Sequence, residues 1–198
     1  MMAAKIFLDT CSIIALSGLD KAGFELLRSK LEESNSGLYA SHIQVDEKYS
    51  EISDFKQICK KAFEKFEEHG IRIHWEEATK GAVVGVSRVG YCRISGEDLA
   101  RIDDELRREL EKCMNEEGKH KNLDKKAKIL NIARDCLIAL TSTDYDCFIT
   151  SDKCLYKSCI KVLQKNETKK MLEKTPSILY VQPEAKKMLR EILKILNS

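Results

Sequence analysis

The sequence lacks any strong excess of charge of one sign. Its 198 residues include 34 basic and 32 acidic side chains, which leave a formal net charge of only +2. Global charge therefore predicts no partner, and a nucleic-acid surface would have to be a local patch. The sequence also lacks a G-x-G-x-x-G motif after its first apolar run, which argues against a Rossmann-type nucleotide binder. It contains no internal repeat, low-complexity tract or flexible linker.

The sequence has no C-x-x-C pair, although it contains eight cysteines: Cys11, Cys59, Cys92, Cys113, Cys136, Cys147, Cys154 and Cys159. Zinc sites typically use ligands clustered at short spacings, and disulfide scaffolds are usually small and loop-rich. We therefore interpret the cysteines as reduced thiols of a cytoplasmic protein. The first apolar run is too short to span a bilayer and is interrupted by Asp9, so we expect neither a membrane span nor a signal peptide.

Short apolar runs alternate with amphipathic stretches along the chain. Helices are predicted over residues 21–33 and 55–70, with Gly70 placed to end the second. This alternation predicts βαβ units, and hence an α/β protein: one three-layer α/β/α domain over residues 1–198 with a mostly parallel central sheet of about five strands. The predicted strands are KIFL (5–8), GLYAS (37–41), IRIHW (71–75), DCFIT (146–150) and SILYV (177–181).

Residues 85–128 break this alternation. Apolar residues recur there at steps of three and four, which predicts an amphipathic helix that Gly118 ends. A second helix is predicted from near Asn122 through Leu140. We interpret 85–128 as a helical elaboration within the domain, and as a candidate surface for a homodimer or another partner. The recurring residues are Leu99, Ile102, Leu106, Leu110 and Met114.

Acidic residues occupy positions that could converge. Asp9 ends the first predicted strand between apolar flanks, and Asp152 follows the fourth strand directly. The carboxyl ends of parallel strands form the ligand-binding edge of such sheets. Glu47 follows the second strand on a predicted helix, and Asp135 lies in an apolar helix that leads into the fourth. An unpaired buried charge is too costly, so Asp9 must be hydrogen-bonded, paired or metal-bound.

Each acidic residue also has a simpler interpretation. Asp152 could cap the following helix, Asp135 could pair with a basic neighbour, and Glu47 could be a solvated helical residue. Taken together, however, converging carboxylates repel one another unless a cation neutralises them. Mg²⁺ or Mn²⁺ is the natural occupant, because both accept oxygen ligands. Asp46 and Glu51 compete with Glu47 for the role of second ligand.

The order of these residues resembles the PIN-domain family. The resemblance rests on Asp9-Thr10 after the first strand, Ser41 six residues before Glu47, Asp135 opening an apolar run, and Thr150-Ser151-Asp152 after the fourth strand. It covers roughly residues 4–75 and 129–182. It implies a Mg²⁺- or Mn²⁺-dependent endoribonuclease that cleaves single-stranded RNA with a metal-activated water. The implied metal ligands and catalytic residues are Asp9, Glu47, Asp135 and Asp152, and the supporting hydroxyls are those of Thr10, Thr150 and Ser151.

Three alternatives bear on this interpretation. The elaboration makes the chain longer than the compact toxin members of the family, which argues against a toxin held by an antitoxin. A catalytically silent relative would instead serve as a scaffold that binds RNA or a protein. A haloacid-dehalogenase-like phosphotransferase, with Asp9 as nucleophile, is disfavoured because Cys11 stands where a second Asp is needed.

A basic stripe is predicted along the helix that follows Asp152. Lysines recur there at every fourth position, with no acidic residue between them, so they share one helical face. The stripe could guide RNA phosphates away from the metal, which would make binding strongly salt-dependent, or it could be an ordinary solvated face. Its members are Lys153, Lys157, Lys161 and Lys165.

Overall fold

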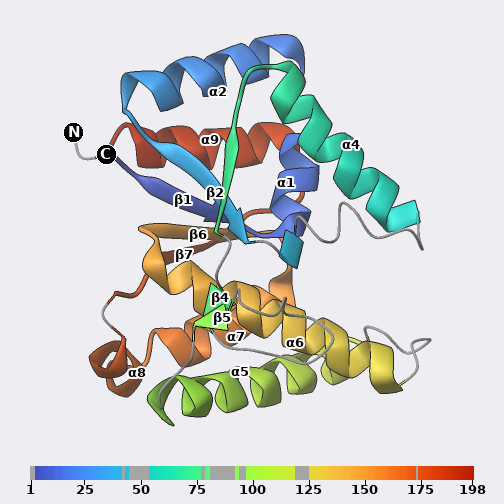
Figure 1. The fold of residues 1–198 in the computed structure, drawn as a ribbon, viewed down its shortest axis with the longest axis vertical. Coiled ribbons are helices and arrows are strands. Elements are labelled where there is room, and N and C mark those ends of the chain that lie inside the picture. Colours follow the sequence, from blue (N-terminus) through green and yellow to red (C-terminus); the bar gives the residue numbers. More distant parts are fainter. Residues whose placement is uncertain are drawn as a thin grey trace.

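The five predicted apolar runs form one parallel sheet in a computed structural model of the protein (Figure 1). The sheet order is β3-β2-β1-β6-β7. A separate parallel pair joins β4 (Thr79–Lys80) to β5 (Cys92–Arg93). The structure describes residues 3–41, 43–44, 54–76, 79–80, 92–93, 97–118, 125–172 and 174–198. The strands of the main sheet are β1 (Lys5–Leu8), β2 (Gly37–Ser41), β3 (Ile73–Glu76), β6 (Cys147–Thr150) and β7 (Ser177–Tyr180).

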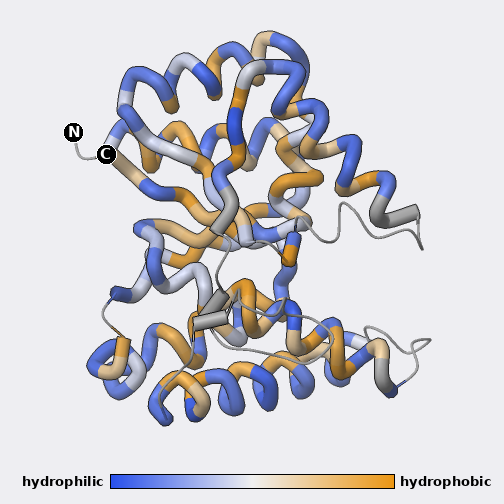
Figure 2. The backbone as a smooth tube through the Cα atoms, viewed as in Figure 1, coloured by the Kyte–Doolittle hydropathy of each residue, from blue (hydrophilic) through white to orange (hydrophobic). Residues whose placement is uncertain are grey.

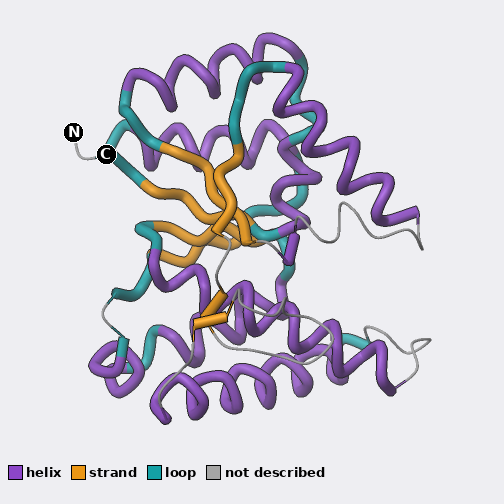
Figure 3. The backbone as a smooth tube through the Cα atoms, viewed as in Figure 1, coloured by secondary structure: helices purple, strands orange, loops and turns teal. Residues whose placement is uncertain are grey.

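The central strands form because apolar side chains on both of their faces are buried. In β1, Ile6 and Leu8 join the core on one side of the sheet, and Phe7 joins the core on the other. In β6, Ile149 and Phe148 divide between the two cores in the same way. Parallel sheets of this kind need helices over both faces. Figure 3 shows the strands lying between two groups of helices.

The helices confirm the predicted three-layer α/β/α arrangement. One layer covers the first face of the sheet and shares its core with Ile6 and Leu8 (Figure 1). It contains α1 (Thr10–Leu16), α2 (Lys21–Glu33), α4 (Asp54–Glu68) and α9 (Ala185–Leu196). The other layer contains α5 (Glu97–Glu116), α6 (Lys125–Thr141), η1 (Ser142–Asp144), α7 (Lys153–Leu163) and α8 (Asn166–Met171). Within the described part of the chain, every helix is too short or too polar to cross a bilayer.

Two helix ends fall where glycine was predicted to stop them. Gly70 follows α4 with φ +69, and Gly118 follows α5 with φ +67. These left-handed backbone conformations are readily adopted by glycine, because a Cβ would strain them. The second helix of the elaboration begins at Lys125 within the described residues and runs through Thr141, so the predicted span to Leu140 is confirmed at its end.

The elaboration packs on the core through the apolar face of α5. Ile102, Leu106 and Leu110 are almost fully buried in the same cluster as Phe7 and Phe148. In Figure 2, apolar positions alternate with polar ones along α5. The face that the sequence offered as a partner surface is therefore used within the chain. A homodimer stays a prediction, and the apolar face of α5 no longer supports it because that face is buried in the core.

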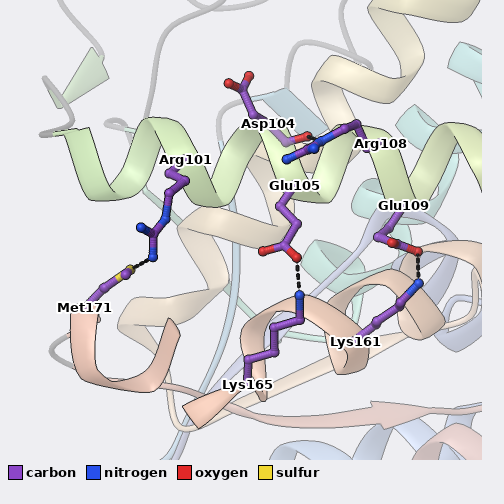
Figure 4. Close-up of polar contacts among 8 residues, drawn as sticks. All are labelled: Arg101, Asp104, Glu105, Arg108, Glu109, Lys161, Lys165 and Met171. Atoms are coloured by element: carbon purple, nitrogen blue, oxygen red, sulfur yellow. Dashed lines mark hydrogen bonds and ion pairs between the residues drawn. The ribbon is translucent and has the colours of Figure 1, made fainter. Parts of the chain in front are cut away.

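Charged side chains reinforce the contact between α5 and α7 (Figure 4). The Lys161 ammonium lies 2.6 Å from a Glu109 carboxylate oxygen, and Lys165 pairs with Glu105. All four side chains remain partly exposed, so each pair contributes little to stability. The pairs do fix how one helix lies along the other, because each lysine has a glutamate opposite it.

We predict that Leu106→Ala lowers the free energy of unfolding by about 2–5 kcal/mol, because it leaves a cavity where α5 meets the core. Leu26→Ala on α2 is the matched control: Leu26 is 43% exposed, and its loss should change stability by no more than about 0.5 kcal/mol. Urea denaturation of both variants measures the difference. If both variants change the free energy of unfolding by the same small amount, α5 does not unfold together with the sheet.

Candidate functional site

Asp9 and Thr150 are brought together by the pairing of β1 with β6. Leu8 is in register with Ile149, so Asp9 directly after β1 and Thr150 at the end of β6 lie at the same edge of the sheet. The Asp9 N–H extends this pairing by donating to the Ile149 carbonyl oxygen at 3.1 Å. Asp9 then caps α1, where its Oδ1 accepts from the Ser12 N–H at 2.6 Å. The side chain is buried, with 3% exposure for the residue.

The second carboxylate oxygen of Asp9 joins the ends of the two strands. Its Oδ2 accepts a hydrogen bond from the Thr150 hydroxyl and another, at 3.3 Å, from the Ser151 N–H. The Thr150 hydroxyl oxygen also accepts from the Asp152 N–H at 3.0 Å. A charge between apolar flanks is thus satisfied by donors from α1, from the last residue of β6 and from the residue after it. Ser12, which the sequence did not single out, contributes one of them.

Burial raises the pKa of the Asp9 carboxyl, and the negative charge of Asp152 raises it further. Hydrogen bonds from Ser12 and Thr150 oppose this rise in the pKa only in part. The ionised form of Asp9 is therefore costly for the folded chain. A cation near Asp9 would relieve both the desolvation and the repulsion.

Asp152 is the N-cap of α7, as one of its two interpretations predicted. Its Oδ1 accepts from the N–H groups of Cys154 at 2.6 Å and Leu155 at 2.9 Å. Capping places the carboxylate at the positive end of the α7 dipole. The same position brings its charge within range of Asp9.

Asp135 lies on α6 on the same side of the sheet. Burial, followed by the negative charges of Asp135, Asp9 and Asp152, raises the pKa of the Cys159 thiol. The three carboxyl groups therefore all lie within electrostatic range of one buried side chain. Within the described part of the chain, no three carboxylates have oxygen atoms within 4.8 Å of one another. Mg²⁺ keeps several waters when it binds protein, so a shared ion here would be held partly through water.

The second predicted ligand lies outside the described residues, as do its two competitors: Glu47, Asp46 and Glu51. Ser41 and Gln44, which precede it in the chain, are among the described residues. Gln44 is fully buried, its Oε1 accepts from the N–H and hydroxyl of Ser41, and its Nε2 donates to the Leu8 carbonyl at 2.5 Å. Gln44 therefore ties the ends of β1 and β2 beside Asp9. Sequence reasoning missed Gln44, because nothing in the sequence around a single amide indicates that it is buried.

The supporting hydroxyls differ in their surroundings. Thr10 is a buried first residue of α1, and Thr150 bonds Asp9. The Ser151 hydroxyl oxygen is buried and has no hydrogen-bond partner among the described residues. Buried polar groups are normally satisfied, so an orphan beside two carboxylates indicates a position that a water or ligand would fill.

The predicted lysine stripe faces acidic residues of α5. Lys153 and Lys157 both contact the same Glu117 carboxylate oxygen, at 3.2 and 3.0 Å. Lys161 and Lys165 have the glutamate partners described above. The sequence could not place α5 opposite α7, so these partners were not foreseen. The pairing gives the stripe a structural role, and binding of RNA by it stays a prediction.

No protein-family model matches the chain, and no curated protein sequence is significantly similar to it. The resemblance to PIN domains therefore rests on the ordered sequence motifs alone.

We predict that, without divalent cations, Asp9→Asn is at least as stable as the wild type at neutral pH. Asparagine keeps an oxygen for the Ser12 N–H and removes the buried charge. Its NH2 group can donate to the Thr150 hydroxyl oxygen, so the long 3.3 Å bond from the Ser151 N–H is the one that is lost. Because burial raises the folded-state pKa of Asp9, its ionisation penalty is full above that pKa and disappears as pH falls through it. The difference in unfolding free energy between variant and wild type should therefore shrink toward acid pH.

Urea denaturation in EDTA at a series of pH values measures this difference. Asp20→Asn, at the exposed cap of α2 that accepts from the Gly23 N–H, is the matched control. If both variants show the same pH dependence relative to the wild type, the buried charge of Asp9 is not the cause.

Proposed function

We propose that the protein is a Mg²⁺- or Mn²⁺-dependent endoribonuclease that cleaves single-stranded RNA. The observation that supports this most is the pair of Asp9 and Asp152 at the carboxyl edge of neighbouring parallel strands. One of them is buried, and the charge of the other raises its pKa. Like charges in this setting favour binding of a cation. The preference for single-stranded RNA comes from the resemblance to PIN domains.

The described residues fit a hard divalent ion that is held partly through water. Asp9, Asp152 and Asp135 would hold it, with Glu47 as the fourth carboxylate. The orphan hydroxyl of Ser151 supports this fit, because it offers an unused polar contact at the same place. A divalent ion bound there would supply the charge that activates a water and stabilises the leaving oxygen.

The chain's own groups would fix the geometry of the reaction. Hydrogen bonds from Ser12, Thr150 and Ser151 hold the Asp9 carboxylate in one orientation. The Ser151 hydroxyl would orient a water or a phosphate oxygen. The described cysteines carry thiols rather than disulfides, which supports a cytoplasmic location as part of this proposal.

A catalytically silent scaffold that binds RNA or protein is the second candidate. Two observations favour it: both Asp9 and Asp152 serve as helix caps, and the described carboxylates do not gather within 4.8 Å. Helix capping would explain both residues without any metal. The two candidates differ in whether negative charge at these positions is needed for metal binding.

We predict that the wild type cleaves a labelled single-stranded RNA with Mn²⁺ or Mg²⁺ and not with EDTA, and that Asp9→Asn abolishes the cleavage. Asp20→Asn changes another helix cap and should cleave like the wild type. Circular dichroism confirms that all three proteins fold. Cleavage by Asp9→Asn at the wild-type rate would point to a contaminating nuclease, and absence of cleavage by the wild type would favour the scaffold.

Asp152→Asn separates capping from metal binding. Asparagine caps helices about as well as aspartate, so α7 and the melting temperature should be preserved. Loss of the charge should weaken Mn²⁺ binding by about 10- to 100-fold, as measured by calorimetry. Unchanged Mn²⁺ binding would mean that Asp152 acts only as a cap.

A further inference from the structure

A cluster of sulfur and oxygen ligands lies at the contact of α5 with α7, next to the Asp152 cap but with none of the carboxylates of the proposed active site among its members. Cys113, Glu117 and Cys154 place their potential ligand atoms within 4.8 Å of one another. We propose that these residues bind a soft divalent cation of the zinc class. The proposal does not rest on the proposed nuclease function.

The backbone arranges the ligands for chelation. The Glu117 N–H donates to the Cys113 carbonyl at 2.9 Å, so the helical turn continues and both side chains share a face. Cys154 approaches from the first turn of α7. In a tetrahedral zinc site with Zn–S bonds near 2.3 Å, ligand atoms lie about 3.5–3.8 Å apart. Movements of the ligand atoms by about 1 Å would therefore fill three coordination positions of the ion. Water would take the fourth position, on the exposed side of Glu117.

Cys113 interrupts a regular acidic stripe. The residues of α5 and its end that follow one another at every fourth position opposite the lysines are Glu105, Glu109, Cys113 and Glu117. A glutamate at position 113 would complete the ion-pair pattern. The thiol instead lies beside the buried thiol of Cys154, where two sulfur ligands meet from different helices.

The charges at the cluster suit a divalent cation bound by thiolates. Hydrogen bonds from Lys157 and Lys153 lower the pKa of Glu117, so its carboxylate is ionised and ready to coordinate. Binding removes one proton from each cysteine, because thiolate is the ligand form. Two protons are then replaced by one divalent ion, so the net charge of the cluster and its two lysines does not change. The lysines also offset the negative charge of the thiolates.

An unsatisfied hydroxyl provides a second observation. Ser158 lies one turn after Cys154 and is only 2% exposed, and its Oγ has no hydrogen-bond partner among the described residues. It lines a cavity of about 170 Å³ together with Cys113 and Lys157, so the cavity borders the cluster on its Cys113 side. The cavity can hold water, and a metal-bound thiolate or water would give the hydroxyl an acceptor.

Such an ion would join the elaboration to the helix that carries Asp152. The Cys154 N–H donates to Asp152 Oδ1 at 2.6 Å, so a ligand bound by Cys154 would also fix the start of α7. A disulfide oxidant could instead join the two thiols to each other. That reaction would not involve Glu117 or the two lysines that contact it. Thiol counting therefore belongs in the test.

The experiment uses the full chain, reduced with a phosphine, stripped with EDTA and desalted. We expect one equivalent of Co²⁺ to produce thiolate-to-metal absorption that Zn²⁺ abolishes by displacement, and Zn²⁺ to raise the melting temperature. Cys113→Ser, Cys154→Ser and Glu117→Gln should each weaken Zn²⁺ binding by about tenfold or more in competition with a chromophoric chelator. Glu117 is exposed, so Glu117→Gln should fold even if a buried cysteine variant does not.

Cys11→Ser is the matched control, because Cys11 is an exposed thiol on α1. It should bind Zn²⁺ as the wild type does. The proposal is overturned if the reduced protein binds no Zn²⁺, or if Cys11→Ser removes binding while Glu117→Gln and the other two variants retain it. It is also overturned if thiol counting finds Cys113 and Cys154 joined as a disulfide and their reduction yields no metal binding. None of these measurements depends on RNA cleavage.

Discussion

The buried carboxylate of Asp9 is the constraint on which the carboxyl edge of the sheet depends. It needs several donors at once, and the chain supplies them from the first turn of α1, from the last residue of β6 and from the residue that follows it. Leaving a buried polar group unpaired costs about 1–3 kcal/mol, and more for a charge. The hydrogen bonds of one side chain therefore link α1, β1 and β6 at this edge, and the same residue is the one best placed to meet a cation.

Helix α7 connects this edge to the elaboration. Its first turn satisfies Asp152, its apolar face shares a core with α5, and its lysines meet the glutamates of that helix. The burial of Leu106 and its neighbours holds the two helices together, since partly exposed ion pairs add little. The charges fix their alignment instead. A shift of α5 relative to the sheet would therefore also move the start of α7, where Asp152 caps the helix.

Local patterns were enough to predict the sheet and the position of Asp9. Continuous apolar runs predicted the strands β1 and β6, because a strand that is buried on both faces has apolar residues at successive positions. Gly70 and Gly118 marked the ends of two helices. Contacts between distant segments could not be predicted in this way. Glu105 opposite Lys165, and Cys113 beside Cys154, depend on how α5 docks. Gln44 was missed for a different reason, because a single buried amide has no periodic pattern.

The order of the strands has a consequence for how the protein folds. Along the chain, β1, β2 and β3 come first and the elaboration follows them. Only then comes β6, which pairs with the free edge of β1. The hydrogen bond from Thr150 to Asp9 spans 141 residues. Closing so long a loop is slow, because its entropy is lost before the contact is gained. The two acidic strand ends should therefore meet late in folding, and a nascent chain would lack its candidate site until just over three quarters of its length has been synthesised.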